Sequence, residues 1–95
     1  MDLSELEQRA VKELMDELQR RLELETKNLD SARFEFTKLQ IRVKLFGEET
    51  LDDKERKAFV HACPGDIAKH EAAIAHLQAQ LDKLLAYGKE CRDTS

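Results

Sequence analysis

Apolar residues recur along the first half of this chain at alternating spacings of four and three residues. The stripe consists of Val11, Met15, Leu18, Leu22, Leu29, Ala32, Phe36, Leu39, Val43 and Phe46. Residues at these spacings lie on one side of a helix, and a partner helix is needed to cover them. No Pro or Gly interrupts the chain before Gly47. The pattern predicts one long helix over about residues 4–46, begun by Ser4 and Glu7 as a capping pair.

Residues 33–46 also alternate between apolar and polar side chains, which is the pattern of a β-strand. A strand needs a partner strand, and we find no second alternating segment in the chain. We therefore favour the helix, although a strand paired with a second copy of itself stays open. In the helical interpretation, Phe34, Ile41 and Leu45 fall outside the stripe and are exposed unless another surface covers them.

The connection after the long helix carries its own signals. Gly47 suits a C-terminal cap, and residues 48–50 suit a short turn. Thr50 and Asp53 repeat the spacing of a capping pair. We expect a second helix to follow over about residues 51–62.

Pro64, within the run Cys-Pro-Gly-Asp, predicts a break or a kink in the returning arm. A third helix should then run over about residues 64–87. Gly88 suits its cap, which leaves residues 88–95 as a flexible tail. Two stripes follow the third helix: Ile67, His70, Ile74, Leu77, Leu81 and Leu84 in one, and Ala68, Ala72, Ala75, Ala79 and Ala86 beside it. The small residues either admit a second neighbouring helix or are present only as good helix formers.

An antiparallel return pairs residues whose numbers add up to about 97. Large residues of the first helix then face the alanines of the third. Glu25 and His70 each interrupt an apolar stripe and fall close together. Either they form a buried polar pair that fixes the register, or both turn outward into water.

These signals together predict one all-α domain over residues 1–95. The architecture is an antiparallel coiled-coil-like helical hairpin, with one long N-terminal helix and a return arm broken or kinked at Pro64, which makes three helices. A hairpin this thin buries little apolar area, so assembly into a larger bundle stays open.

One segment of the chain is basic. The chain has a formal net charge of -4, but residues 31–47 carry four bases and one acid. Binding of nucleic acid or a membrane surface through residues 33–44 is a remote alternative, because acidic segments flank this stretch and the aromatic residues lie among apolar ones.

No motif of catalysis is visible. His61 and Cys63 are too few for a zinc site, and there is no Gly-rich phosphate loop or Ser-centred turn. We expect no enzyme, no cofactor, no metal and no small-molecule substrate. Cys63 and Cys91 are expected as free thiols. No apolar run is long enough for a transmembrane segment and the N-terminus is acidic, so we expect an intracellular, cytoplasmic protein.

The apolar residues outside the stripes indicate a binding surface. The partner-binding hypothesis names the apolar residues Phe34, Ile41, Leu45, Leu24 and Leu14 and the basic residues Arg33, Lys38 and Arg42; Leu3 and Leu6 are further spare apolar residues. We expect a self-associating scaffold or adaptor that forms a homodimer. The alternative is a small monomeric chaperone or effector domain that binds a globular client.

Overall fold

The computed structural model describes the backbone of residues 4–93 and the side chains of residues 4–88, and it is almost entirely helical. The elements in chain order are α1 (Glu5–Phe46), a 3₁₀ turn (Glu48–Thr50), α2 (Asp53–Lys57), a π-helical turn (Ala58–Ala62) and α3 (Cys63–Asp93). No strand occurs within the described range. The all-α class is therefore confirmed, and residues 33–46 are helical.

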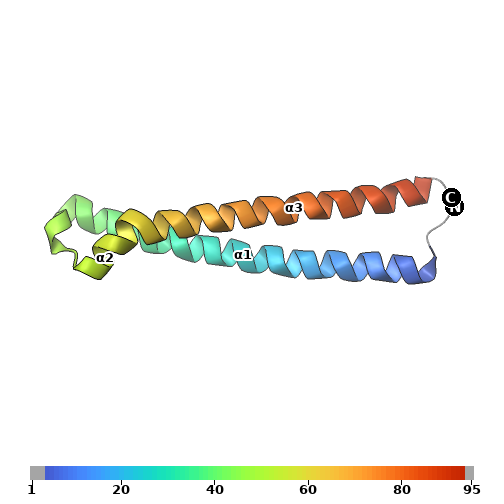
Figure 1. Cartoon of the computed structure of the whole chain (residues 1–95), viewed down its shortest axis with the longest axis horizontal. Coiled ribbons are helices and arrows are strands. Elements are labelled where there is room, and N and C mark those ends of the chain that lie inside the picture. The colour runs from blue at the N-terminus through green and yellow to red at the C-terminus, as the bar shows by residue number, and fades with distance from the viewer. Residues whose placement is uncertain (1–3, 94–95) are drawn as a thin grey trace.

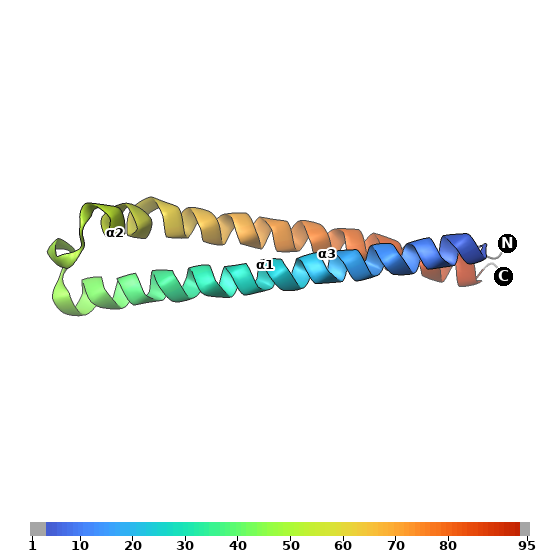
Figure 2. The same cartoon turned by 90° about the horizontal axis from the view of Figure 1, so that it is seen from below.

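Two long helices lie side by side along most of their length (Figures 1 and 2). α1 runs in one direction and α3 returns, so the start of α1 and the end of α3 lie at the same end of the molecule. The molecule measures 66 × 17 × 16 Å. Only one face of each long helix can meet the other in a shape this thin.

The start and the end of α1 follow from local chemistry. Ser4 Oγ accepts a hydrogen bond from the Glu7 amide at 3.1 Å, which satisfies a free donor of the first turn. At the other end, the Gly47 amide donates to the Val43 carbonyl at 3.0 Å while the backbone of Gly47 has φ 92°. A β-carbon at position 47 would meet the carboxylate of Glu49. Glycine is therefore required at this turn.

The second helix begins later than residue 51, and its predicted capping pair is wrong. The Thr50 hydroxyl donates to the Gly47 carbonyl at 2.7 Å, so it belongs to the turn. Asp52 is the cap instead: its carboxylate accepts from the Glu55 amide at 2.7 Å, and the Glu55 carboxylate accepts from the Asp52 amide at 3.2 Å. Leu51, only 4% exposed, anchors the connection.

The structure has two long helices rather than the predicted three, because the helical path continues through Pro64. The Cys63 amide donates to the Ala58 carbonyl, five residues back, in place of the usual four. This wider turn accommodates the proline ring and its missing donor without ending the helix. Gly88 does not end α3 either, which continues to Asp93, so a tail from residue 88 is wrong. Residues 94–95 lie outside the described range.

The α1 stripe and the first α3 stripe form the seam between the helices. The most deeply buried residues are Leu29, Leu51, Cys63, Leu77 and Leu81. The expected pairing of large α1 residues with the alanine stripe is wrong, since Ala68, Ala72, Ala75, Ala79 and Ala86 are all exposed. Phe46 is also exposed, at 64%, although its spacing placed it in the seam. Phe36 and Phe59 close the seam near the turn with ring centroids 5.5 Å apart.

Candidate functional site

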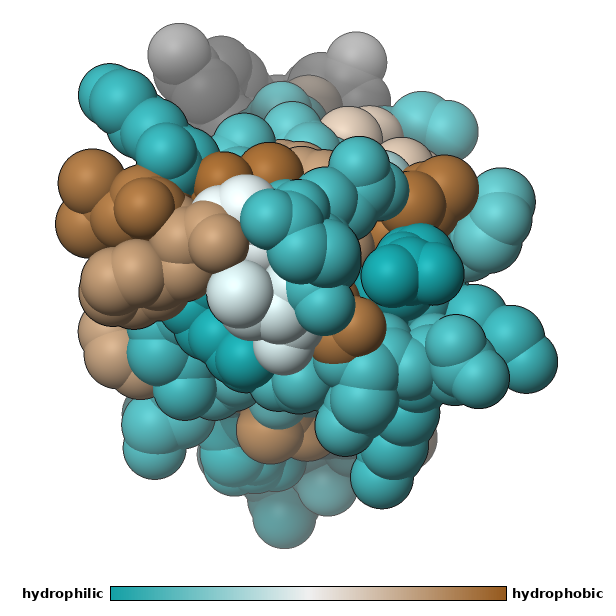
Figure 3. Space-filling model, turned by 90° about the vertical axis from the view of Figure 1, so that its left-hand side faces the viewer, coloured by the Kyte–Doolittle hydropathy of each residue, from teal (hydrophilic) through white to brown (hydrophobic). Residues whose placement is uncertain are grey.

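Three large apolar side chains lie on the side of α1 that faces away from α3. Phe34, Ile41 and Leu45 are 63%, 50% and 65% exposed. Their spacings of seven and four residues put them on one line of the helix, with Lys38 between them, opposite the seam. We call Phe34, Lys38, Ile41 and Leu45 the back face of α1. The view onto the turn end shows apolar side chains at the upper left and in smaller groups elsewhere, among mostly hydrophilic ones (Figure 3).

The other apolar residues of the hypothesis lie apart from the back face. Leu24 and Leu14 are 59% and 47% exposed, as a surface role requires. Leu24 precedes Phe34 by ten residues, about 15 Å along the helix axis, and Leu14 lies a further ten residues away and on a different side of the helix. Leu6 is exposed too, whereas Leu3 lies outside the described residues. The structure therefore groups only the residues near the turn.

Some exposed apolar residues were not anticipated. Val60, Leu85 and Tyr87 are 49%, 53% and 42% exposed. Val60 could have been found, because Phe59 faces the seam and its neighbour must then point away from it. Tyr87 is engaged within the chain, since its hydroxyl donates to the Glu7 carboxylate at 3.2 Å and so ties α3 to the start of α1.

The basic residues near the back face differ in how firmly they are held. Arg33 lies 3.7 Å from Glu71, and Lys38 lies 2.9 Å from Glu35, with more than half of each side chain exposed. Lys38 Nζ also sits 5.0 Å from the centroid of the Phe34 ring. Exposed pairs of this kind are weak. These two cations can therefore exchange their carboxylates for those of another molecule.

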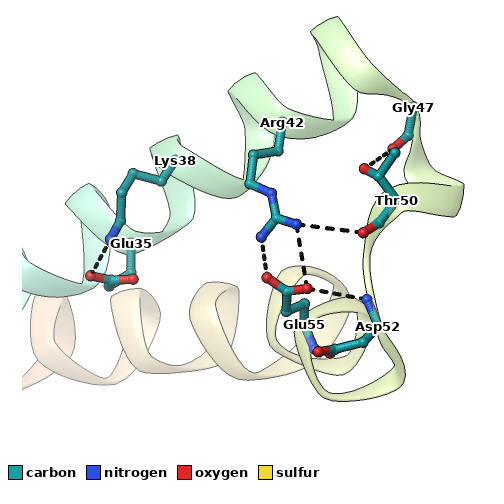
Figure 4. A network of polar contacts seen from close by, with 7 residues as sticks. All are labelled: Glu35, Lys38, Arg42, Gly47, Thr50, Asp52 and Glu55. Atoms are coloured by element: carbon teal, nitrogen blue, oxygen red, sulfur yellow. Dashed lines mark hydrogen bonds and ion pairs between the residues drawn. The ribbon is translucent and has the colours of Figure 1, made fainter.

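Arg42, in contrast, is bound into the fold (Figure 4). Its guanidinium forms an ion pair with Glu55, places a second nitrogen 3.4 Å from that carboxylate, and donates to the Thr50 carbonyl at 3.5 Å. The hydrogen bond from Arg42 is the main reason why the pKa of Glu55 is lowered, and the same bond raises the pKa of Arg42. Arg42 thus joins α1 to the return arm.

The structure brings Glu25 and His70 together in the seam. His70 Nδ1 lies 2.6 Å from Glu25 Oε2, and the side chains are 20% and 27% exposed for His70 and Glu25. The Arg33–Glu71 pair also joins the two helices, but more than half of each of its side chains is exposed, whereas Glu25 and His70 lie within the apolar stripes. The Glu25–His70 pair is therefore placed to select one register between α1 and α3.

An open groove of about 810 Å³ follows the seam near the turn and is lined by parts of residues 28–42 and 52–70. Cys63 lines it, and burial is the main reason why the pKa of its thiol is raised, with Asp66 and Glu35 adding to this. Raising the pKa keeps the thiol protonated and poorly nucleophilic. His61 is exposed whereas Cys63 is buried, so the two do not form a paired site.

Cys63 is a free thiol, and the side chain of Cys91 lies outside the described residues. Among the described residues, no group of three His, Cys, Asp or Glu side chains could hold a metal ion. No helix in that range has both the length and the apolar character to cross a membrane.

Comparison with known proteins gives no match: no protein-family model, no curated protein and no solved structure is similar to the chain.

Proposed function

We propose that the chain is an antiparallel coiled-coil hairpin that serves as a non-enzymatic protein–protein interaction module, a scaffold or adaptor that binds through the back face of α1. The observation that carries this proposal is the exposure of Phe34, Ile41 and Leu45 along one line of one helix face. Large apolar side chains grouped on an exposed face are typical of an interface.

The division of α1 into two faces supports the proposal. The seam already covers the apolar stripe that the fold needs, and Leu29 in that stripe is only 6% exposed. The back face is therefore not required to hold α1 against α3. A two-helix molecule also buries little apolar surface for its length, so a partner on the back face adds burial that the chain alone lacks.

Two forms of this function differ in what covers the back face. A second copy would give a homodimer and a bundle of four long helices, the self-associating scaffold. A different protein would make the chain a monomeric chaperone or effector domain with a globular client. Binding of nucleic acid or membrane through residues 33–44 is less well supported, because Arg42 is held by Glu55 within the chain and acidic segments flank this stretch.

Sedimentation equilibrium over a wide concentration range tests the proposal, with wild type beside Phe34→Asp/Ile41→Asp. A dimer that the double variant loses supports the scaffold. A monomer supports the effector form when affinity capture from the native source yields a protein that wild type retains and the double variant loses. The matched control is Leu6→Asp, because Leu6 is 74% exposed on the same helix but far from the back face.

An assembly that the double variant leaves intact contradicts a role for the back face. A monomer that captures no protein sensitive to the substitutions contradicts the interaction function as a whole.

A further inference from the structure

The shape of the back face limits what can cover it. Phe34 and Leu45 are eleven residues apart, so the apolar line is about 16 Å long, or three turns of helix. It is a ridge on the convex surface of a single helix, with Lys38 standing between the apolar side chains. A second helix that lies along the ridge matches both its length and its shape.

The charges along the ridge are basic. Lys38 forms an ion pair with Glu35, and the side chains of Lys38 and Glu35 are 51% and 59% exposed. Lys44 is exposed, and no ion pair forms on it among the described residues. Glu35 is the one acid between residues 31 and 47. A partner with carboxylates beside its apolar side chains would therefore complement this stretch.

A second copy of the chain fits these charges poorly. An antiparallel copy that sets Phe34 against Ile41 has its two-fold axis between residues 37 and 38, which places the two Lys38 side chains next to each other. A parallel copy sets each lysine near its own counterpart. Like charges in contact oppose association in either arrangement.

We propose that the back face binds an acidic amphipathic helix of another protein. Its apolar side chains pack against Phe34, Ile41 and Leu45, and its carboxylates pair with Lys38 and Lys44. This inference rests on the proposed function and specifies its effector form.

Two synthetic peptides of about three heptads probe this chemistry. Both carry the same leucines on one helix face, and they differ in carrying glutamate or lysine at the flanking positions. Fluorescence anisotropy of the labelled peptides against the full chain measures binding. We expect the glutamate peptide to bind, the lysine peptide not to bind, and the affinity for the glutamate peptide to fall several-fold as salt is raised.

Variants identify the surface and the role of charge. Phe34→Asp/Ile41→Asp should weaken the glutamate peptide by at least about tenfold, while Leu6→Asp should leave it unchanged. Lys38→Glu/Lys44→Glu should reverse the preference, so that the lysine peptide binds and the glutamate peptide does not. Circular dichroism of each variant checks that the helices are intact.

Four outcomes overturn the inference. If both peptides bind equally, or if Phe34→Asp/Ile41→Asp still binds both peptides, the back face does not bind an acidic helix as proposed. A homodimer that Phe34→Asp/Ile41→Asp abolishes also contradicts the inference but preserves the proposed function, because the back face then binds a second copy. In the last outcome, the chain binds vesicles of phosphatidylglycerol and phosphatidylcholine but neither peptide, and the same variant loses the vesicle binding. The back face then binds a membrane instead of a protein, which contradicts both proposals.

Discussion

The two faces of α1 carry side chains of the same kind but differ in burial and in contacts. Phe36 stacks on Phe59 in the seam, whereas Phe34, two residues earlier, is 63% exposed. The polar residues differ in the same way, since Glu25 is paired across the seam with His70 while Lys38 is held only by a neighbour on its own helix. Position relative to α3, rather than hydrophobicity, separates the residues packed in the seam from those left exposed.

The largest effect should come from opening the seam. Leu77 is 3% exposed, so Leu77→Ala leaves a gap that the two helices cannot fill, and we expect a loss of about 2–4 kcal/mol in the free energy of unfolding. Urea denaturation followed by circular dichroism measures it. Leu6→Ala removes the same atoms from an exposed site and should change stability by less than about 0.5 kcal/mol. Equal losses at the two positions would erase the distinction between seam and surface.

Substituting both Glu25 and His70 tests how their polar pair contributes to the stability of the seam. Glu25→Leu/His70→Leu replaces two partly desolvated side chains by apolar ones, and we expect a gain of about 1–2 kcal/mol, since the pair is still reached by solvent. Either substitution alone should destabilise the protein, because it leaves its partner unpaired. Thermal melts of the single and double variants separate these outcomes. An unchanged melting temperature in all three would mean that the pair contributes nothing to the seam.

The turn decides which face of α1 the return arm covers. Gly47→Ala forces a β-carbon into a backbone with φ 92° and against Glu49, so we expect a loss of about 1–2 kcal/mol. Gly65→Ala is the matched control. Position 65 is helical and nothing lies within 4 Å of an added β-carbon, so that variant should gain about 0.5–1 kcal/mol. Urea denaturation of the two variants checks the opposite signs, and a loss at both positions would contradict the special role of the turn.

The smallest effect on stability should come from the back face. Phe34→Ala removes a largely exposed ring, so we expect a change within about 0.5 kcal/mol. Phe36→Ala removes the ring that stacks on Phe59 and should cost about 3 kcal/mol. Parallel urea denaturation of the two variants compares neighbouring phenylalanines directly. A large loss from Phe34→Ala would show that the back face belongs to the fold, and would contradict its proposed role.

The sequence was sufficient for the features set by local chemistry and by the stripes. Ser4, Gly47 and the apolar spacing predicted the bounds of α1, and the helix that was favoured over a strand for residues 33–46 is confirmed. The exposure of Phe34, Ile41 and Leu45 followed from the same spacing.

Other features depend on competing interactions that a sequence does not rank. Pro64 and Gly88 are common helix terminators, but a π turn relieves the first and the helix simply continues through the second. Thr50 matches a capping residue, yet the Gly47 carbonyl takes its hydroxyl. The alanine stripe suggested a contact, but two helices offer each other only one face.

The π turn at residues 58–62 also affects the helical phase of the return arm. A turn closed over five residues contains one residue more than an α-helical turn, so the return arm carries one residue in excess of what its path requires. That extra residue sits between the turn at Gly47 and the long seam formed by α3. Because it changes the helical phase, the side chains before residue 58 face α1 in a different phase from those after residue 62.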